Sequence, residues 1–348
     1  MNIIYDDTIF NIQKYGGVSR YFSKIIGLLK KDSNVNIEIA RTFWVGLPWK
    51  LRKLNDILLS LRLDLSRSDV YHPTYYSNLV KKRSNVKTVV TVYDMIHELY
   101  AHKFTGLNSG IEIKKTSILN ADHIICISNN CKKDLQNFYG IKNDCISVIY
   151  LGVCLSRANT NEDMNKKAVY FKKPYILYVG NRKYHKNFDL LVNAFFILGI
   201  KDSFDLICFG ADDFSHDEIS GFKKMDLINS VKHVEGNDES LYLYYKNADI
   251  FVYPSFYEGF GLPVLEAMAN DCPVVASNAG SILEIAGNAA LLFSPDNVDE
   301  LCCCIKTMLN DIDMKKEYIK RGRERVKSFS WEKTAAETYN IYKMVLNK

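Results

Sequence analysis

Short apolar runs rich in β-branched residues alternate with longer stretches of helical periodicity along most of the chain. Runs of this length, bounded by polar and turn-forming residues, are typical of buried strands. In the first half we expect strands at residues 2–5, 35–40, 69–72, 88–93, 123–127 and 146–149. In the second half we expect them at residues 175–179, 205–209, 232–235, 250–253, 273–276 and 290–293.

Helical patterns separate many of these runs. We expect helices at residues 18–29, 129–138, 187–198, 239–246, 263–269, 298–309, 314–326 and 331–346. In the first of them, five apolar residues share one face: Tyr21, Phe22, Ile25, Ile26 and Leu29. Ser128 is placed to cap the second helix.

Strands that alternate with helices predict an α/β protein with parallel, doubly wound sheets. The pattern occurs twice, so we expect two Rossmann-like domains facing a central cleft. The first should span residues 1–155, joined by a terminal helix at 331–348 that crosses back to it, and the second residues 174–326. A polar stretch at 156–173 is the expected linker.

Charge and composition narrow the function. No apolar run is long enough for a membrane helix, and acids near the N-terminus argue against a signal peptide, so we expect a cytosolic protein. Nine cysteines without a CxxC pair suit a reducing compartment. Residues 1–170 carry a net charge of +9 and the remainder −4, so the basic half should meet an anionic partner. Nucleic acid, an acidic membrane surface and a phosphorylated substrate remain open, whereas the absence of GxGxxG and Walker A motifs disfavours dehydrogenases and P-loop NTPases.

The segment 253–275 carries the clearest chemical signal. A glycine-containing loop follows a buried strand and leads into Pro263, which suits a helix start. The backbone N–H groups of Phe260, Gly261 and Leu262 would then form an anion site suited to a diphosphate. Glu258 precedes this site, and Glu266 lies one helical turn beyond it. Carboxylates in these places would accept hydrogen bonds from sugar or ribose hydroxyls. The alternative is that the glycines only turn the chain and both acids are solvated.

Glu258 and Glu266, with seven residues between them, form a Glu-x7-Glu pattern that resembles the retaining family-4 glycosyltransferases. Segments 15–22, 71–76, 92–98, 178–187 and 329–333 are also similar to this family, so the resemblance covers nearly the whole chain. It implies the GT-B fold, in which two Rossmann-like domains face a cleft. It further implies transfer of a hexose, with retention, from a nucleotide-diphosphate sugar to a glycan. We expect GDP-mannose as donor, with a UDP-hexose as the alternative, and a lipid-linked surface polysaccharide as acceptor.

The resemblance also implies roles on the donor side. Glu266 would bind the ribose, Glu258 would act at the donor sugar, and the loop amides of residues 260–262 would hold the diphosphate. Lys186 and Arg182 would neutralise the diphosphate, unless they are surface residues of their loop. Gly16 and Gly17 would let the backbone approach the phosphates, unless they form a plain tight turn.

On the acceptor side, Tyr93 stands where many relatives have histidine. Asp94 and His97 are then the nearest groups able to bind an acceptor hydroxyl, and both are candidate catalytic residues. Asp94 could instead cap the following segment, and His97 could be structural. We expect neither a metal nor another cofactor, because basic side chains and helix N–H groups can stabilise the leaving diphosphate. The pair Asp311 and Asp313 is interpreted as a solvated turn.

Residues 43–67 combine basic side chains with leucines at 51, 54, 58, 61 and 65. This segment is either a helix that packs on the core or one that docks on the anionic inner face of a membrane. A non-catalytic protein that binds nucleotide sugars also stays open. A nucleic-acid binder is disfavoured, because the basic residues are spread over many segments.

Overall fold

The structure is a computed structural model that describes residues 1–13, 16–41, 57, 59–64, 67–81, 83, 85–103, 108–154, 173–210 and 212–347. The chain forms two compact units. The first comprises Met1–Gly152 and Ser330–Lys348, and the second comprises Val153–Phe329.

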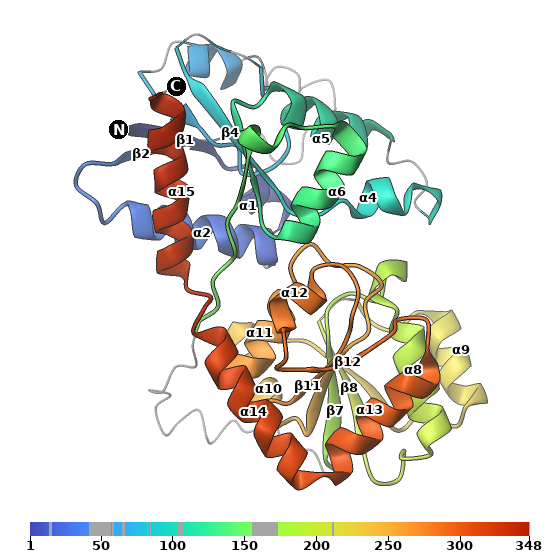
Figure 1. The fold of residues 1–348 in the computed structure, drawn as a ribbon. Coiled ribbons are helices and arrows are strands. Elements are labelled where there is room, and N and C mark those ends of the chain that lie inside the picture. The colour runs from blue at the N-terminus through green and yellow to red at the C-terminus, as the bar shows by residue number, and fades with distance from the viewer. Residues whose placement is uncertain are drawn as a thin grey trace. The chain divides into compact units, whose positions relative to one another are not determined.

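The first unit contains a parallel sheet with strand order β2-β1-β3-β4-β5-β6 (Figure 1). Its strands are β1 (Asn2–Asp6), β2 (Asn36–Ala40), β3 (Val70–Tyr71), β4 (Lys87–Val92), β5 (His123–Cys126) and β6 (Ile146–Val148). Its helices are α1 (Thr8–Ile12), α2 (Gly17–Leu29), α4 (Ile96–Leu99), α5 (Asn108–Asn120), α6 (Asn129–Tyr139) and α15 (Trp331–Leu346), with 3-10 turns η1 (Ala101–Lys103) and η2 (Asn143–Cys145). The strands are added on one side of β1 first (β2) and then on its other side (β3 to β6), so the strand order reverses between β1 and β3. These two strands pair in parallel, with Ile3 opposite Val70.

The last helix, α15, packs against α2 in the first unit (Figure 1). Buried polar side chains hold it there. The His72 ring bonds through Nδ1 to the Tyr342 hydroxyl at 2.6 Å and through Nε2 to Thr91 Oγ1 at 2.9 Å. Tyr342 also bonds to the Tyr5 hydroxyl at 2.9 Å. Complete burial lowers the pKa of His72 to about 3, so its ring is neutral at physiological pH.

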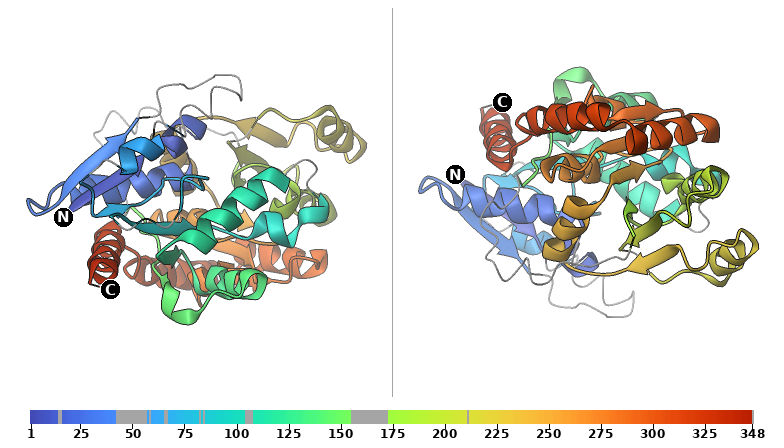
Figure 2. Two further views of the ribbon diagram at one scale, coloured as in Figure 1. Left: turned by 90° about the horizontal axis from the view of Figure 1, so that it is seen from above. Right: turned by 90° about the horizontal axis from the view of Figure 1, so that it is seen from below.

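The second unit has a parallel sheet with strand order β12-β11-β10-β7-β8-β9. Its strands are β7 (Tyr175–Val179), β8 (Asp205–Phe209), β9 (Val231–Val234), β10 (Ile250–Tyr253), β11 (Val274–Ser277) and β12 (Leu291–Phe293). Its helices are α8 (Phe188–Leu198), α9 (His216–Lys224), α10 (Asp238–Asn247), α11 (Leu262–Ala269), α12 (Ile282–Ala286), α13 (Val298–Asn310) and α14 (Ile312–Val326), with a 3-10 turn η3 (Tyr184–Lys186). Figure 2 shows from two further directions how helices flank the strands.

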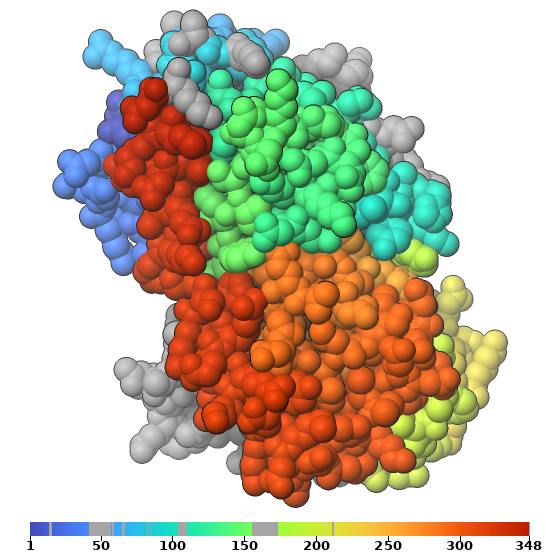
Figure 3. All heavy atoms as spheres, viewed as in Figure 1, coloured from blue at the N-terminus to red at the C-terminus, as the bar shows by residue number. Residues whose placement is uncertain are grey.

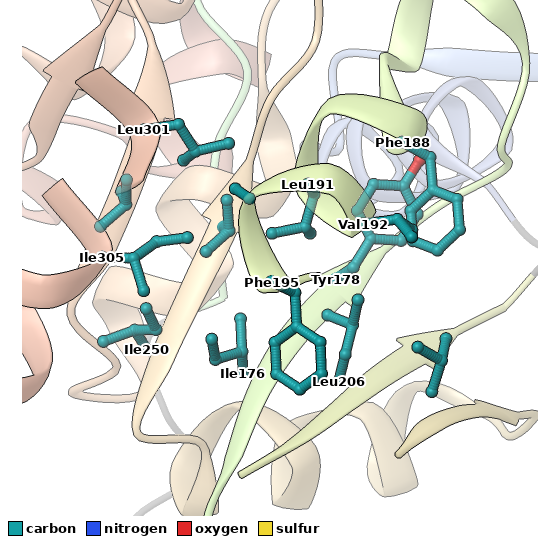
Figure 4. Packing of buried hydrophobic residues seen from close by; sticks show 14 of the residues in the cluster. Ile176, Tyr178, Phe188, Leu191, Val192, Phe195, Leu206, Ile250, Leu301 and Ile305 are labelled. Carbon is teal, nitrogen blue, oxygen red and sulfur yellow. The ribbon is translucent and has the colours of Figure 1, made fainter. Parts of the chain in front are cut away.

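The core of this second unit lies between its sheet and the helices α8 and α13. The residues labelled in Figure 4 are buried together: Ile176, Tyr178, Phe188, Leu191, Val192, Phe195, Leu206, Ile250, Leu301 and Ile305. The sheet is apolar on both faces because helices cover both, as in other parallel sheets. On the face shown in Figure 3, α13 and α14 form much of the unit's surface.

Strand order in the second unit matches the Rossmann pattern 3-2-1-4-5-6, with the reversal between β7 and β10. Ligands of open α/β sheets bind beyond the carboxyl ends of the strands at such a reversal. The fold therefore predicts a ligand site at the loops after β7 and β10.

Every strand expected from the sequence is present within about two residues of its expected bounds. The eight expected helices are also present, and Ser128 caps α6 by accepting from the Cys131 N–H at 3.0 Å. The helices α1, α4, α5, α9 and α12 were not expected. The two sheets with their helices confirm an α/β protein.

The leucine pattern in residues 43–67 needs a correction where the structure describes it. Leu61, which the pattern places on the apolar stripe, is 51% exposed, whereas Leu59 and Leu63 are buried in the core. The opposite face, rather than the expected one, packs inward here. The rest of the question lies outside the described residues, as does the expected linker at 156–173. Within the described ranges, none of the helices combines the length and apolarity required to span a bilayer.

Candidate functional site

Two sequence-predicted site residues meet at the β7/β10 reversal of the second unit. Lys186 ends the η3 turn after β7, and Glu258 lies in the loop after β10. The Lys186 Nζ donates to Glu258 Oε1 at 2.7 Å. Their side chains are only 13% and 11% exposed. The pair therefore places one positive and one negative group, largely shielded from solvent, where the fold predicts a ligand.

Tyr253, the last residue of β10, is a third member of this cluster. Lys186 Nζ donates to its hydroxyl oxygen at 3.2 Å and lies 5.3 Å from the centre of its ring. Burial, together with the Glu258 carboxylate, raises the pKa of Tyr253 well above its ordinary value, so the phenol stays protonated. From the sequence, Tyr253 is predicted only as the end of a strand, although its place at the carboxyl end of a central strand is a usable signal for a site residue.

The loop after β11 fixes the backbone of Glu258. The Ser281 hydroxyl donates to the Glu258 carbonyl oxygen at 2.8 Å, and the Ser281 N–H donates to it at 3.3 Å. Gly280 has a φ of +57°, and a Cβ placed there would lie 3.0 Å from the same carbonyl oxygen. Glycine is required because a side chain would both strain the backbone and push this loop from Glu258.

The start of α11 follows directly. Gly261 precedes the helix with a φ of 99°, a left-handed conformation that favours glycine. The helix begins at Leu262, so Pro263 is its second residue rather than its first. The N–H groups of Gly261 and Leu262 donate to no other described residue. They are the orphan donors that helix starts offer to anions.

Glu266 lies one turn inside α11, as expected. One of its carboxylate oxygens accepts from the Tyr245 hydroxyl of α10 at 3.3 Å. This hydrogen bond orients the carboxylate. It does not neutralise the negative charge, because the phenol of Tyr245 is uncharged.

Arg182 lies in the same loop as Lys186 but has different partners. Its Nε donates to Glu218 Oε1 at 2.6 Å, and its Nη2 donates to the carbonyls of Asp212 and Asp213 at 2.7 and 2.8 Å. Its guanidinium also lies 4.8 Å from the Phe214 ring centre. Arg182 thus ties the β7 loop to the start of α9, and its assignment to a diphosphate stays a prediction.

Gly16 and Gly17 begin α2 in the first unit. Gly16 is extended, and its carbonyl accepts from the Arg20 N–H at 3.0 Å. A Cβ added at Gly17 would meet nothing within 4 Å among the described residues. None of the described residues therefore blocks a close approach to the Gly17 backbone, and Gly16 is the residue that precedes the helix.

The loop after β4 in the first unit holds Tyr93, Asp94 and His97. Asp94 caps the segment that follows, since its Oδ1 accepts from the Ile96 N–H at 3.1 Å. Tyr93 is buried against Tyr21, Tyr75 and Tyr76, and its hydroxyl donates to the Thr74 carbonyl at 3.4 Å. Tyrosine at this position therefore has packing and hydrogen bonds of its own. His97, at the second position of α4, is partly exposed.

The described residues offer no cluster of side chains that could bind a metal ion. The described ranges contain no group of three or more histidine, cysteine or acidic side chains placed to hold an ion. Asp311 caps α14 by accepting from the Met314 N–H at 2.9 Å, and Asp313 is exposed in the first turn of that helix. Both acids are exposed, as the predicted solvated turn requires, but Asp313 belongs to the helix and only Asp311 precedes it.

Comparison with known proteins identifies the family. The model described as Glycosyltransferase Family 4 matches residues 32–157, and that described as Glycosyl transferases group 1 matches residues 159–325. An uncharacterized glycosyltransferase of Methanocaldococcus jannaschii is 30% identical over 85% of this chain and 94% of its own length. The chain belongs to the family-4 glycosyltransferases. The family predicted from the Glu-x7-Glu pattern is thereby confirmed.

Two mannosyltransferases match over shorter stretches. The O-antigen chain mannosyltransferase B of Escherichia coli is 37% identical over 49% of this chain and 46% of its own length. The O-antigen chain mannosyltransferase RfbU of Salmonella typhimurium is 29% identical over 63% of this chain and 60% of its own length. The chain thus spans about half of these relatives.

Solved structures of glycosyltransferases share the fold over essentially the whole chain. Sucrose-phosphate synthase from Thermosynechococcus elongatus has a TM-score of 0.81 at 21% identity and covers 100% of this chain and 99% of its own. HepE of Anabaena, solved in complex with UDP-glucose, has a TM-score of 0.75 at 17% identity and covers 98% and 99%. The fold of this family-4 chain is the two-domain α/β GT-B fold.

Proposed function

We propose that this protein transfers a hexose, with retention of anomeric configuration, from a nucleotide-diphosphate sugar to a glycan acceptor. GDP-mannose is the favoured donor, because two of the relatives are O-antigen chain mannosyltransferases. For the same reason the favoured acceptor is a lipid-linked precursor of a surface polysaccharide, met at the cytosolic face of the membrane.

The observation that carries this proposal is the Lys186–Glu258 pair at the β7/β10 reversal, with Glu258 in the loop that leads to Gly261 and Leu262, whose N–H groups donate to no described residue. In the proposed complex, Lys186 and the N–H groups of Gly261 and Leu262 bind the diphosphate. Glu258 then faces the sugar, and Glu266 accepts hydrogen bonds from the ribose hydroxyls.

These groups suffice for the charge chemistry of transfer. As the anomeric carbon loses its bond to phosphate, positive charge develops on the sugar and negative charge on the leaving diphosphate. Lys186 and the helix N–H groups stabilise the negative side, and the Glu258 carboxylate the positive side. In a retaining reaction on the leaving-group face, the departing phosphate can take the acceptor's proton. We therefore propose a reaction without a metal ion, in which chelators leave the rate unchanged.

A two-stage experiment tests the function. Thermal unfolding is first measured with GDP, UDP, ADP and dTDP, because a ligand at about a hundred times its Kd stabilises the native state by about 2.7 kcal/mol. Transfer of radiolabelled hexose from GDP-mannose or UDP-glucose to octyl α-mannoside is then followed with and without EDTA, and the product linkage is read by NMR.

Stabilisation by GDP, with transfer from GDP-mannose and a retained configuration, is the expected result. Stabilisation by UDP with transfer from UDP-glucose would replace the donor but keep the reaction. Nucleotide binding without transfer from either donor would instead indicate a non-catalytic nucleotide-sugar-binding protein.

A further inference from the structure

A buried cation lies beneath the loop that carries Asp94 in the first unit. Lys114, on α5, has a side chain that is only 3% exposed. Its Nζ donates to the main-chain carbonyl of Asp94 at 2.6 Å and to Glu98 Oε2 at 2.8 Å. It also lies 5.5 Å from the centre of the Tyr76 ring. A buried ammonium is costly unless it is paired in this way, so its retention calls for an explanation beyond packing.

Lys114 shapes the position of the Asp94 side chain. Its Nζ is 4.0 Å from Asp94 Oδ1, the oxygen that also accepts from the Ile96 N–H. The second oxygen, Oδ2, makes no hydrogen bond to any described residue, and the side chain is 32% exposed. One oxygen is thus held inward, and the other remains available to a ligand.

Glu98 completes the arrangement. Its side chain is 4% exposed, and its Oε1 accepts from the Tyr139 hydroxyl at 2.7 Å. Two carboxylates face one ammonium here, and the buried Glu98 takes the closest ion pair with Lys114. The surplus negative charge therefore resides on Asp94, the more exposed of the two carboxylates.

We propose that Lys114 is a positioning residue for the acceptor: it anchors the Asp94 backbone and one carboxylate oxygen, so that Oδ2 receives a hydroxyl group of the acceptor sugar. This inference rests on the proposed function, and it adds to that function a residue that holds its acceptor-side carboxylate. A carboxylate oxygen with no donor of its own is well suited to accept from a sugar hydroxyl.

The test compares five variants with the parent, using transfer to octyl α-mannoside at varied acceptor and donor concentrations. Lys114→Met removes the cation. Lys114→Met/Glu98→Gln removes it without leaving a buried carboxylate unpaired, and so protects the fold. Lys115→Met is the matched control, because Lys115 is the exposed neighbour on the same helix. Asp94→Asn, alone and combined with Lys114→Met, measures the coupling between the two positions.

The Lys114→Met/Glu98→Gln variant should raise the acceptor KM by about tenfold or more, while its donor KM stays within about twofold of the parent's. Asp94→Asn should raise the acceptor KM similarly, and adding Lys114→Met to it should have little further effect. An acceptor KM equal to that of Lys115→Met would overturn the inference, as would a parallel rise in donor and acceptor KM, which indicates general damage. Absence of transfer by the parent itself would instead refute the proposed function.

Discussion

Replacing Glu258 with glutamine should have opposite effects on nucleotide binding and on transfer. The Glu258 Oε1 atom lies 2.7 Å from the Lys186 Nζ atom. A nucleoside diphosphate can take the hydrogen bonds of Lys186 only by displacing that carboxylate or by binding beside its negative charge. The variant keeps the size and one acceptor oxygen of the side chain, but it removes the charge.

The size of the gain follows from the two kinds of hydrogen bond. A bond to a charged group contributes about 1.5–3 kcal/mol and a neutral one about 1 kcal/mol. The shielding of this pair from solvent places it in that range rather than with exposed ion pairs, which contribute far less. Exchanging one kind for the other should release about 0.5–2 kcal/mol to an incoming diphosphate. The Kd of the free nucleoside diphosphate should therefore fall by about two- to thirtyfold.

Transfer should change in the opposite direction. The variant lacks the carboxylate just as positive charge develops at the anomeric carbon, so kcat should fall by about a hundred- to a thousandfold. Calorimetric titration with the nucleoside diphosphate gives the affinity, and radiolabel transfer at saturating donor gives kcat. Glu317→Gln is the matched control, because it breaks the Glu317–Arg321 pair at 2.9 Å on the exposed surface of α14.

Two results would refute this reasoning separately. Unchanged or weaker affinity in Glu258→Gln would mean that Lys186 need not leave Glu258, and that the ion pair only supports the loop. Transfer at the parental rate would mean that Glu258 does not act on the sugar, whatever the affinity does.

Three further predictions follow from single contacts. Glu266→Ala should weaken nucleotide binding by about ten- to a hundredfold in calorimetry, because the ribose hydroxyls lose a charged acceptor, and an unchanged Kd would contradict the assignment. Arg182→Ala and Glu218→Ala should lower nucleotide affinity to the same extent if Arg182 acts through its 2.6 Å bond to Glu218, whereas loss in Arg182→Ala alone would indicate direct contact with the diphosphate. Because of His72, the free energy of unfolding should fall as the pH drops below 6.5. The His72 ring of the unfolded chain then binds a proton, whereas the native ring, with its pKa of about 3, stays neutral. The loss should reach about 2 kcal/mol at pH 5, so urea unfolding at pH 7 and 5 should show a smaller difference for His72→Gln, and equal differences would disprove the effect.

Most of the strands were predictable because buried parallel strands are short apolar runs rich in β-branched residues, bounded by polar and turn-forming residues. The helices that were not predicted carry no such signal in the sequence or a weaker one. The short helices α1, α4 and α12 consist of about one turn and depend on their neighbours for stability. The helix α9 did carry a signal, since Ser215 and Glu218 form a capping box that its sequence spells out.

The site was predictable as a set of residues but not as a set of contacts. The spacing of Glu258 and Glu266, and the loop with Lys186, could be found by motif. From sequence alone Lys186 and Glu258 have separate tasks, and Glu258→Gln is expected to leave nucleotide affinity nearly unchanged. Their ion pair alters that expectation, and it arises only because the sheet order places β7 beside β10 across many intervening residues.

Lys114 shows the same limit more clearly. It lies in a polar stretch of α5, next to the exposed Lys115, and nothing local distinguishes the two. Its burial depends on Asp94 and Glu98, which are 20 and 16 residues away in the chain. Whether a charged side chain can be buried depends on its partners, because without them the cost of desolvation would exceed any gain from packing.

The Lys186–Glu258 pair is explained by the cost of leaving the Lys186 ammonium without a negative partner. An ammonium placed at 13% exposure needs a negative partner at all times, since an isolated buried cation costs several kcal/mol. In the proposed reaction, a diphosphate supplies that partner only while the donor is bound. Glu258 supplies it in the interval, and Tyr253 adds a neutral oxygen that Lys186 can keep in either state. We infer that Tyr253→Phe would leave the ion pair but slow its exchange for phosphate, lowering the association rate for nucleotide more than it raises the dissociation rate. Stopped-flow binding resolves the two rates, and an effect confined to dissociation would show that the hydroxyl only stabilises the bound complex.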